Sequence, residues 1–301
     1  MIDSVTNVPI DKIESDFLKK HEIELYVQRE DLLHPEISGN KWRKLMYNLL
    51  EYQKGNYKRI ITFGGAFSNH IAATAALGKK YQIPTIGIIR GEKVENSTLS
   101  KATNDGMQLK FISREMYKTK NDELFLKNLQ TEYPHSLLIP EGGSNKFGVK
   151  GCTKITEVLP DFDVIICAVG TGATLAGIIA GLSKHQEAIG IPVLKNANFL
   201  YKDVQQYLDE INCKNTNWKL DLDYHLGGYA RYDNNLVSFI NRFYKETGIK
   251  LDPIYTGKMM FATYELIKEK SLFNKRVIAV HTGGLQGVKG FEERYKKPLF
   301  T

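Results

Sequence analysis

Short apolar runs rich in β-branched residues alternate along the chain with longer segments whose apolar residues recur at helical spacing. The runs at 59–63, 85–90 and 164–169 predict buried strands, and the segments at 68–82 and 174–185 predict helices. Strands that alternate with helices of about 10–15 residues are typical of βαβ units. The pattern therefore predicts an α/β fold with open, mainly parallel sheets flanked by helices.

Glycines follow the predicted strands at five places. They are Gly64–Gly65, Gly142–Gly143, Gly170, Gly227–Gly228 and Gly283–Gly284. In open α/β sheets, ligands bind outside the carboxyl ends of the strands. We therefore expect these five loops to surround one or two crevices.

Length and composition are those of an ordinary globular protein. The sequence has 301 residues, of which 42% are hydrophobic and 25% are charged, enough for one large or two medium domains. The three cysteines, Cys152, Cys167 and Cys213, show no paired spacing, so we expect neither a disulfide framework nor a cysteine zinc site. The first residues do not read as a secretory signal, and no apolar run reaches the roughly 18 residues of a membrane span. We expect a cytoplasmic protein with no membrane partner.

The formal net charge is +7 and the sequence pI is about 9.0. The basic residues are spread along the chain rather than gathered into one arm or helix. This distribution favours solvated surface charge over nucleic-acid binding, and it is compatible with anionic small molecules.

One glycine-rich segment, residues 170–174, follows a predicted strand and opens a helix. Unpaired N–H groups of the first helical turn, together with the helix dipole, favour an anion there. A dinucleotide fingerprint requires a third glycine where Leu175 stands, and no P-loop motif occurs. The segment thus predicts a phosphate site or, alternatively, a tight strand–helix packing turn. Its candidate ligands are Gly170, Thr171, Gly172, Ala173 and Thr174.

Another predicted helix begins at Ser68, Asn69 and His70. Serine and asparagine are preferred N-cap residues, but the same helix start also suits the carboxylate of an amino acid. His70 alone is compatible with a general base, a metal ligand or a structural residue. Because no second histidine follows three or four positions later, we expect no metal site.

Lys41 lies in the stretch SGNKWRKL, behind a flexible Ser-Gly-Asn lead-in and before Arg43 and Lys44. This pattern fits either the basic first turn of a surface helix or a lysine used for covalent chemistry. A lysine, a phosphate loop and a carboxylate-binding helix start around one crevice would suit pyridoxal 5′-phosphate (PLP), whose aldehyde forms an imine with lysine. Burial and the two neighbouring cations would then lower the lysine pKa.

The stretches LYVQREDLLHPEISGNKWRKL, TFGGAFSNHIAATA and GTGATLAG carry a family resemblance that extends over nearly the whole chain. The sequence resembles the 1-aminocyclopropane-1-carboxylate deaminase/D-cysteine desulfhydrase family, PLP enzymes of fold type II, the fold of the tryptophan synthase β-subunit. The resemblance implies two open α/β domains with the cofactor between them. It places a smaller inserted domain at 45–152 and a large cofactor-binding domain at 1–44 plus 153–301. It also implies a homodimer.

The resemblance implies a role for each candidate residue. Lys41 looks like the imine-forming lysine and the base that moves the α-proton. Asn69 looks like the partner of the cofactor ring oxygen, and residues 170–174 would hold the phosphate. Ser68, Asn69 and His70 would bind the substrate carboxylate. Ser68 is also a candidate proton donor or nucleophile. Tyr229 and Tyr255 would flank the substrate and the cofactor.

The family divides at the partner of the pyridine nitrogen. Members that open cyclopropane rings carry a Tyr-Glu pair where this chain has Tyr255 and Thr256, and Thr282 looks like the nitrogen's partner here. A hydroxyl supports a weaker electron sink than a carboxylate does, which suits α,β-elimination. We therefore predict a lyase, with hydrolase as a second class name, that converts D-cysteine or a related small amino acid to pyruvate, ammonia and sulfide.

Three alternatives remain open at the level of the sequence. The first is 1-aminocyclopropane-1-carboxylate deaminase. The second is a nucleotide-binding oxidoreductase that uses the glycine loop and has no use for Lys41. The third is a catalytically silent PLP-binding protein.

Overall fold

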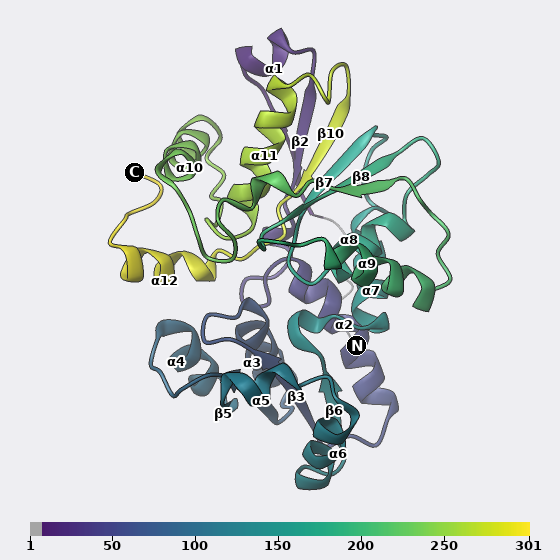
Figure 1. Cartoon of the computed structure of the whole chain (residues 1–301), viewed down its shortest axis with the longest axis vertical. Helices are drawn as coiled ribbons and strands as arrows, with labels where there is room; N and C mark the ends of the chain where they lie inside the picture. Colours follow the sequence, from purple (N-terminus) through teal and green to yellow (C-terminus); the bar gives the residue numbers. More distant parts are fainter. Residues whose placement is uncertain (1–7) are drawn as a thin grey trace.

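Two sheets organise the chain (Figure 1), which a computed structural model describes over residues 8–301. A six-stranded sheet has the order β1-β2-β10-β7-β8-β9 and a four-stranded sheet the order β5-β4-β3-β6. All neighbours pair in parallel except β1 and β2, so the predicted class of two mainly parallel sheets flanked by helices is confirmed. The strands are β1 Ile10–Ile13, β2 Glu24–Gln28, β3 Arg59–Gly64, β4 Thr85–Arg90, β5 Gln108–Ile112, β6 Ser136–Ile139, β7 Val164–Val169, β8 Glu187–Pro192, β9 Trp218–Leu220 and β10 Arg276–Val280.

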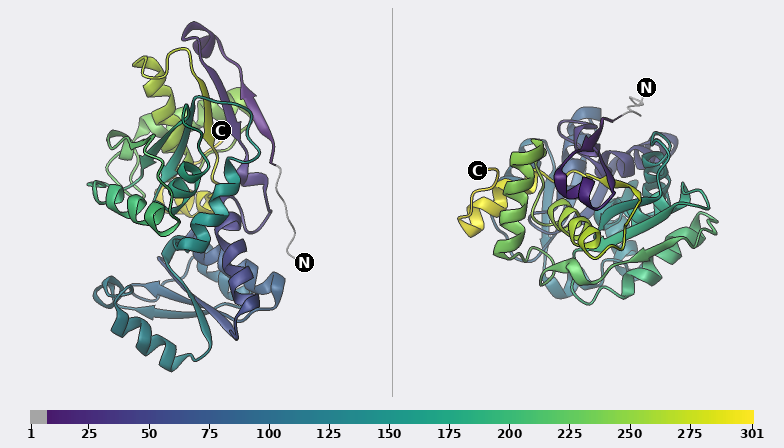
Figure 2. Two further views of the ribbon diagram at one scale, coloured as in Figure 1. Left: turned by 90° about the vertical axis from the view of Figure 1, so that its right-hand side faces the viewer. Right: turned by 90° about the horizontal axis from the view of Figure 1, so that it is seen from above.

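Helices cover both sheets. Figure 2 shows the four-stranded sheet with its helices at one end of the molecule and the six-stranded sheet at the other. Helices α2 and α7 lie between the two, where α7 packs against both α2 and α8. The helices are α1 Asp16–Lys20, α2 Asn40–Lys54, α3 Asn69–Tyr81, α4 Ser97–Asn104, α5 Arg114–Lys118, α6 Glu123–Glu132, α7 Lys146–Cys152, α8 Ala173–Ala180, α9 Phe199–Glu210, α10 Asn234–Thr247, α11 Thr256–Lys268 and α12 Gln286–Tyr295, with short 3-10 turns η1 Glu30–Leu32, η2 Glu141–Gly143, η3 Thr153–Ile155 and η4 Asp223–His225.

Strand β7 shows why the six-stranded sheet needs helices on both faces. All six of its residues, VIICAV, are buried. Val164, Ile166 and Ala168 belong to the apolar core under α10 and α11, whereas Ile165, Cys167 and Val169 belong to the core under α8 and α9. Successive side chains of a strand point to opposite faces, so a strand covered on both sides is continuously apolar.

The segment 222–228 corrects one prediction. We expected a strand that ends at Gly227–Gly228, but β9 ends at Leu220 and is followed by the 3-10 turn η4. Strand β9 is the edge of its sheet, so the chain beyond it has no further strand to pair with. Leu226 then adopts the left-handed conformation, with φ of 49°. The residues beside Tyr229 therefore form a loop, not a strand end.

The predicted domain boundaries fall within α2 and at the end of α7, the two helices between the sheets. That division stays a prediction. Among residues 8–301, no helix has the length and apolar character to cross a membrane. Within the same residues, no cluster of three histidine, cysteine, aspartate or glutamate side chains could hold a metal ion.

Candidate active site

A cavity of about 1230 Å³ opens where the strand ends of both sheets face each other. Its lining comes from the loops after β3, β6, β7 and β10, together with the start of α2 and the loop at 229–231. The cavity gathers the predicted residues Lys41, Ser68, Asn69, His70, Gly170, Thr171, Gly172, Thr174, Tyr229, Tyr255 and Thr282. Ala173, also predicted, has no exposed surface and does not line the cavity.

Gly39 places Lys41 at the start of α2. Its φ is +67°, and a Cβ built on it would lie 2.0 Å from the backbone oxygen of Thr282. The next residue, Asn40, donates its N–H to that same oxygen at 3.2 Å. Only glycine permits this approach of the helix start to the end of β10, which fixes Lys41 in the cavity wall.

The Lys41 amine is partly buried, and its Nζ donates to Asn40 Oδ1 at 2.9 Å. Asn40 Nδ2 in turn donates to Thr174 Oγ1 at 2.9 Å, so Asn40 links the lysine to the glycine loop. Burial and the charge of Lys44 lower the pKa of Lys41 to about 7. Near neutral pH, a large fraction of this amine is therefore uncharged and nucleophilic.

The two cations after Lys41 do different things. Lys44 is buried, lowers the pKa of Lys41 as predicted, and donates to the Gly142 carbonyl oxygen at 3.1 Å. Arg43 turns the other way and donates to both carboxylate oxygens of Glu30 at 2.9 Å. Its expected contribution to the Lys41 pKa is therefore wrong. Because both cations are buried, this is not the basic turn of a surface helix.

Helix α3 begins at the cavity. Ser68 is its N-cap, because Ser68 Oγ accepts the N–H of Ile71 at 3.3 Å. The N–H groups of Asn69 and His70 belong to the first turn and have no acceptor within the helix. Asn69 lies beside Gly284, where a Cβ would come within 3.1 Å of Asn69 Nδ2. Capping and ligand binding at this helix start are thus compatible.

One ring nitrogen of His70, Nε2, is hydrogen-bonded to strand β3 of the four-stranded sheet. Thr62 Oγ1 donates to the Ile139 carbonyl oxygen at 2.8 Å, so it accepts from His70 Nε2 at 2.7 Å. Burial and the charges of Lys41 and Lys44 lower the pKa of His70 well below 6.5. His70 is therefore a neutral, buried histidine, and in the described chain its Nδ1 has no hydrogen-bond partner.

The glycine loop connects β7 to α8 by close contacts. A Cβ on Gly172 would lie 2.9 Å from Val204 Cγ2, and one on Gly170 would lie 3.3 Å from Tyr255 Cε1. Thr171 Oγ1 shares a 2.5 Å hydrogen bond with Ser144 Oγ. The backbone N–H groups of the first turn of α8 have no acceptor within the helix, so they can bind an anion. These donors, and the glycine backbone without side chains, fit a phosphate group.

Two tyrosines form another part of the cavity wall. The rings of Tyr229 and Tyr255 meet edge to face with centroids 6.1 Å apart. Burial and the neighbouring Tyr229 raise the pKa of Tyr255 well above 10, so its hydroxyl stays protonated at neutral pH. The carboxylate of Asp252 accepts the N–H groups of Ile254 at 2.9 Å and Tyr255 at 3.0 Å, which fixes the backbone of Tyr255.

The two candidate threonines differ in orientation. Thr256 is fully buried, and its hydroxyl donates to Asp252 Oδ1 at 2.8 Å. Thr282 lines the cavity at the end of β10. Of the two, Thr282 is therefore the one at the cavity, and Thr256 is a structural residue of the α11 start.

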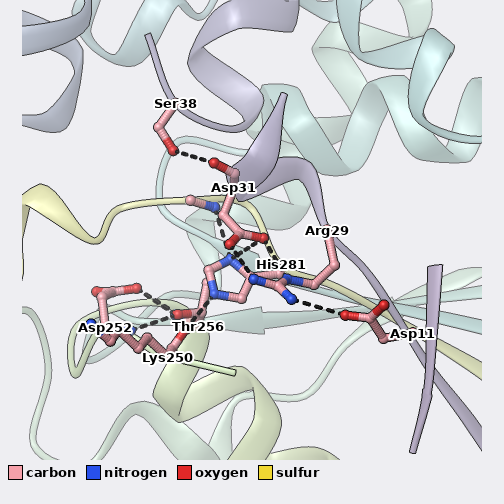
Figure 3. Close-up of polar contacts among 9 residues, drawn as sticks. Asp11, Arg29, Asp31, Ser38, Lys250, Asp252, Thr256 and His281 are labelled. Atoms are coloured by element: carbon pink, nitrogen blue, oxygen red, sulfur yellow. Dashed lines mark hydrogen bonds and ion pairs between the residues drawn. The ribbon is translucent and has the colours of Figure 1, made fainter. Parts of the chain in front are cut away.

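Sequence reasoning missed the buried polar network behind Thr282, which Figure 3 shows. His281 Nε2 lies 2.6 Å from the Lys250 carbonyl oxygen, and His281 Nδ1 lies 3.4 Å from Asp31 Oδ1. Arg29 pairs with Asp31 at 2.8 Å and with Asp11 at 2.8 Å. Asn40 and Asp252 were missed as well. The only signal was that Arg29, Asp31, Asn40 and His281 stand in the REDL, SGNK and HTGG stretches, while Asp11, Lys250 and Asp252 lie elsewhere and carried none.

Comparisons with known proteins agree with this geometry. Residues 3–283 match the family model described as pyridoxal-phosphate dependent enzyme. The mitochondrial bifunctional D-cysteine desulfhydrase/1-aminocyclopropane-1-carboxylate deaminase of Arabidopsis thaliana is 30% identical, over 88% of this chain and 73% of its own length. The D-cysteine desulfhydrase of Yersinia enterocolitica is 25% identical, over 94% of this chain and 93% of its own length. A crystal structure of an ACC deaminase homologue superposes with a TM-score of 0.85 at 25% identity, covering 96% of this chain and 92% of that one.

Proposed function

The chain belongs to the pyridoxal-phosphate dependent enzyme family, and from that premise we propose that it catalyses α,β-elimination on D-cysteine or a closely related small amino acid. The α-proton and the β-thiolate leave the substrate to give aminoacrylate. Aminoacrylate tautomerises and takes up one water to release pyruvate and ammonia, and the thiolate leaves as sulfide. Because the bond is broken by elimination, lyase is the class that fits, and the class name hydrolase is wrong.

The residues around the cavity suit PLP. When bound, PLP supplies an aldehyde that captures an amino group and a ring that delocalises the charge left by the departing α-proton. We assign Lys41 to covalent attachment, residues 170–174 to the phosphate, Asn69 to the ring oxygen and Thr282 to the ring nitrogen. The support is their common position around one cavity and the pKa of Lys41 near 7.

The chain's own side chains divide the remaining tasks. Ser68 and the first-turn N–H groups of Asn69 and His70 bind the substrate carboxylate, since a helix start favours an anion. The neutral Lys41 amine accepts the α-proton. Tyr229 and Tyr255 flank the substrate, and their protonated hydroxyls donate a hydrogen bond to the departing sulfur.

The observation that carries elimination over ring opening is the orientation of the threonines. Thr282 lines the cavity, while the Thr256 hydroxyl is buried and bonded to Asp252. A hydroxyl does not hold a pyridine nitrogen protonated as a carboxylate does. The second candidate is 1-aminocyclopropane-1-carboxylate deaminase, which the printed name of the Arabidopsis relative also contains.

The test is a substrate screen with purified protein reconstituted with PLP. It compares D-cysteine, L-cysteine, β-chloroalanine, serine and 1-aminocyclopropane-1-carboxylate, with sulfide and the keto acids measured separately. We expect equal amounts of sulfide and pyruvate from cysteine and no sulfide from Lys41→Ala. Faster 2-oxobutanoate release from the cyclopropane substrate than pyruvate release from both cysteine enantiomers would overturn the assignment.

We also infer that the enzyme works as a homodimer in the cytoplasm. The inference extends the family resemblance, and sedimentation equilibrium of the holoenzyme tests the dimer. A single species of monomer mass at micromolar concentration contradicts it.

A further inference from the structure

Lys258 is a buried lysine that the proposed reaction does not use. It lies in α11, three residues after Tyr255, and its side chain has no exposed surface. Its Nζ donates to the carbonyl oxygens of His225 and Gly228, each at 2.7 Å. Two short bonds from one amine to two backbone oxygens tie the loop before Tyr229 to helix α11.

That loop has an unusual backbone conformation. Leu226 and Ala230 have φ of 49° and 56°, a conformation that L side chains rarely adopt, and they enclose two glycines that also have positive φ. Such backbone persists only where surrounding contacts determine it. Within the loop, Gly228 N–H donates to the His225 oxygen at 3.0 Å and Arg231 N–H to the Gly228 oxygen at 3.1 Å. The bonds that tie the loop to the rest of the protein include the two from Lys258 and a 3.0 Å bond from Tyr295 Oη to the Ala230 oxygen.

We propose that Lys258 is a positioning residue for the reaction: it holds the 225–231 loop so that Tyr229 stays against Tyr255 at the cavity. This proposal rests on the proposed function, in which these two tyrosines flank the substrate. Helix α11 then sets both rings, because Asp252 fixes Tyr255 at its start and Lys258 fixes the Tyr229 loop one turn later.

The environment of Lys258 fits this role. Burial lowers the pKa of Lys258 to about 8, and the charges of Asp252 and Asp233 oppose that shift. The amine therefore keeps its charge at neutral pH, and charge-assisted bonds to carbonyl oxygens are stronger than neutral ones. The ammonium also has no carboxylate within ion-pair distance among residues 8–301, so loop carbonyls are its partners.

A double-mutant cycle on the holoenzyme tests the proposal. The variants are Lys258→Met, Tyr229→Phe and the pair, with Lys268→Met as the matched control on the exposed side of α11. If Lys258 acts through Tyr229, each single change lowers kcat/KM for cysteine elimination about tenfold, and the pair falls no further than the lower single variant. Losses that multiply, or an unchanged Lys258→Met enzyme, overturn the proposal.

A second measurement does not depend on the reaction. Hydrogen exchange of residues 226–231 is compared in wild type, Lys258→Met and Lys258→Arg, the last serving if the methionine variant fails to fold. We expect faster exchange confined to this loop in Lys258→Met and near wild-type exchange in Lys258→Arg. Unchanged exchange contradicts the positioning role. If the wild-type enzyme turns over no amino acid, the proposed function fails, but the hydrogen-exchange comparison still decides whether Lys258 holds the loop.

Discussion

The two walls of the cavity are built in different ways. The lysine wall consists of Gly39–Lys41, the start of α3 at Ser68–His70, and residues 170–174. It uses helix N-termini and closely packed glycines, of which Gly39 meets the backbone of Thr282 and Gly170 and Gly172 meet side chains. The tyrosine wall consists of Tyr229 and Tyr255, and two buried charged side chains behind it, Asp252 and Lys258, bind the backbone that carries them. The first wall is thus made of backbone, and the second of long side-chain contacts.

This difference assigns a different task to each wall. Under the proposed function, the backbone donors and Lys41 hold PLP, so this wall sets cofactor capture. Under the same proposal, the hydroxyls of Tyr229 and Tyr255 face the part of the substrate that departs. We therefore expect changes in the lysine wall to remove the cofactor and changes in the tyrosine wall to slow the reaction with the cofactor in place.

The largest effect is expected for Lys41→Ala. Loss of the attacking amine and of the proton acceptor should lower turnover by at least about 10³-fold, since positioned acid–base groups alone contribute about 10²–10⁴-fold. The checks are sulfide release and the absorbance of lysine-bound cofactor, both of which should disappear. Turnover within tenfold of wild type would show that another group binds the cofactor and accepts the proton.

Gly39→Ala tests how much the lysine wall depends on backbone contact. Its Cβ would meet the Thr282 oxygen at 2.0 Å, so the start of α2 must move, and we expect a loss of about 3–5 kcal/mol in the free energy of unfolding, at the high end for single substitutions. Gly248→Ala is the matched control. Its φ is +71° with no atom within 4 Å, so it should lose only about 1–2 kcal/mol. Equal losses in urea unfolding of the two variants would refute the contact argument.

Tyr255→Phe separates the two walls directly. We expect elimination to slow about 10²-fold because a donor to the departing sulfur is lost, while cofactor affinity and absorbance stay unchanged. Steady-state kinetics and spectral titration with PLP measure the two quantities. A parallel loss of cofactor affinity would mean that this tyrosine belongs with the lysine wall.

Thr282→Glu asks whether the hydroxyl at the end of β10 tunes the ring. A carboxylate there favours a protonated nitrogen, so we expect a shifted cofactor absorbance and about tenfold slower elimination, or about 1.4 kcal/mol. The control is Thr282→Gln, which has similar size and no charge. If glutamate and glutamine give the same spectrum and rate, Thr282 does not face the nitrogen.

The smallest effect concerns the pH dependence of cofactor capture. The neutral Lys41 amine is the reactive form, so capture by the cofactor-free protein should rise with pH through about 7. The charge of Lys44 lowers this pKa, so Lys44→Met should raise it and move the rise to higher pH. Stopped-flow absorbance measures the profile, with the exposed Lys54→Met as control. An unshifted pH profile in Lys44→Met would show that the charge of Lys44 does not lower the pKa of Lys41.

The sequence could predict the lysine wall because its residues are contiguous. SNH and GTGAT each lie between a strand end and a helix start, and local rules place such residues at a shared sheet edge. SGNK opens helix α2. Arg43 shows where local reasoning fails, since its partner Glu30 precedes it by thirteen residues in a separate 3-10 turn. Proximity in sequence predicts that Arg43 lowers the pKa of Lys41, but the ion pair with Glu30 directs its guanidinium elsewhere.

The tyrosine wall could be predicted only in part. Tyr229 and Tyr255 stood beside glycine turns, but nothing in a single sequence shows that Lys258 reaches back 30 residues to the Gly228 oxygen. The segment LDYHL at 222–226 predicts a strand from its sequence, whereas the edge strand β9 ends before it, at Leu220. Long-range pairing of buried charges, and the place where a sheet stops, depend on packing that periodicity does not encode.

Reduction of the PLP-loaded enzyme with borohydride, followed by peptide mass mapping, tests the central assignment most directly, because it fixes the cofactor to the lysine that holds it. The cavity is lined by three lysines in the described chain, Lys41, Lys44 and Lys120, so the method has real alternatives to distinguish. We predict the pyridoxyl mass on Lys41 alone, at about one per chain. The mass on Lys44 or Lys120, or an unmodified chain after saturation with PLP, would contradict the account.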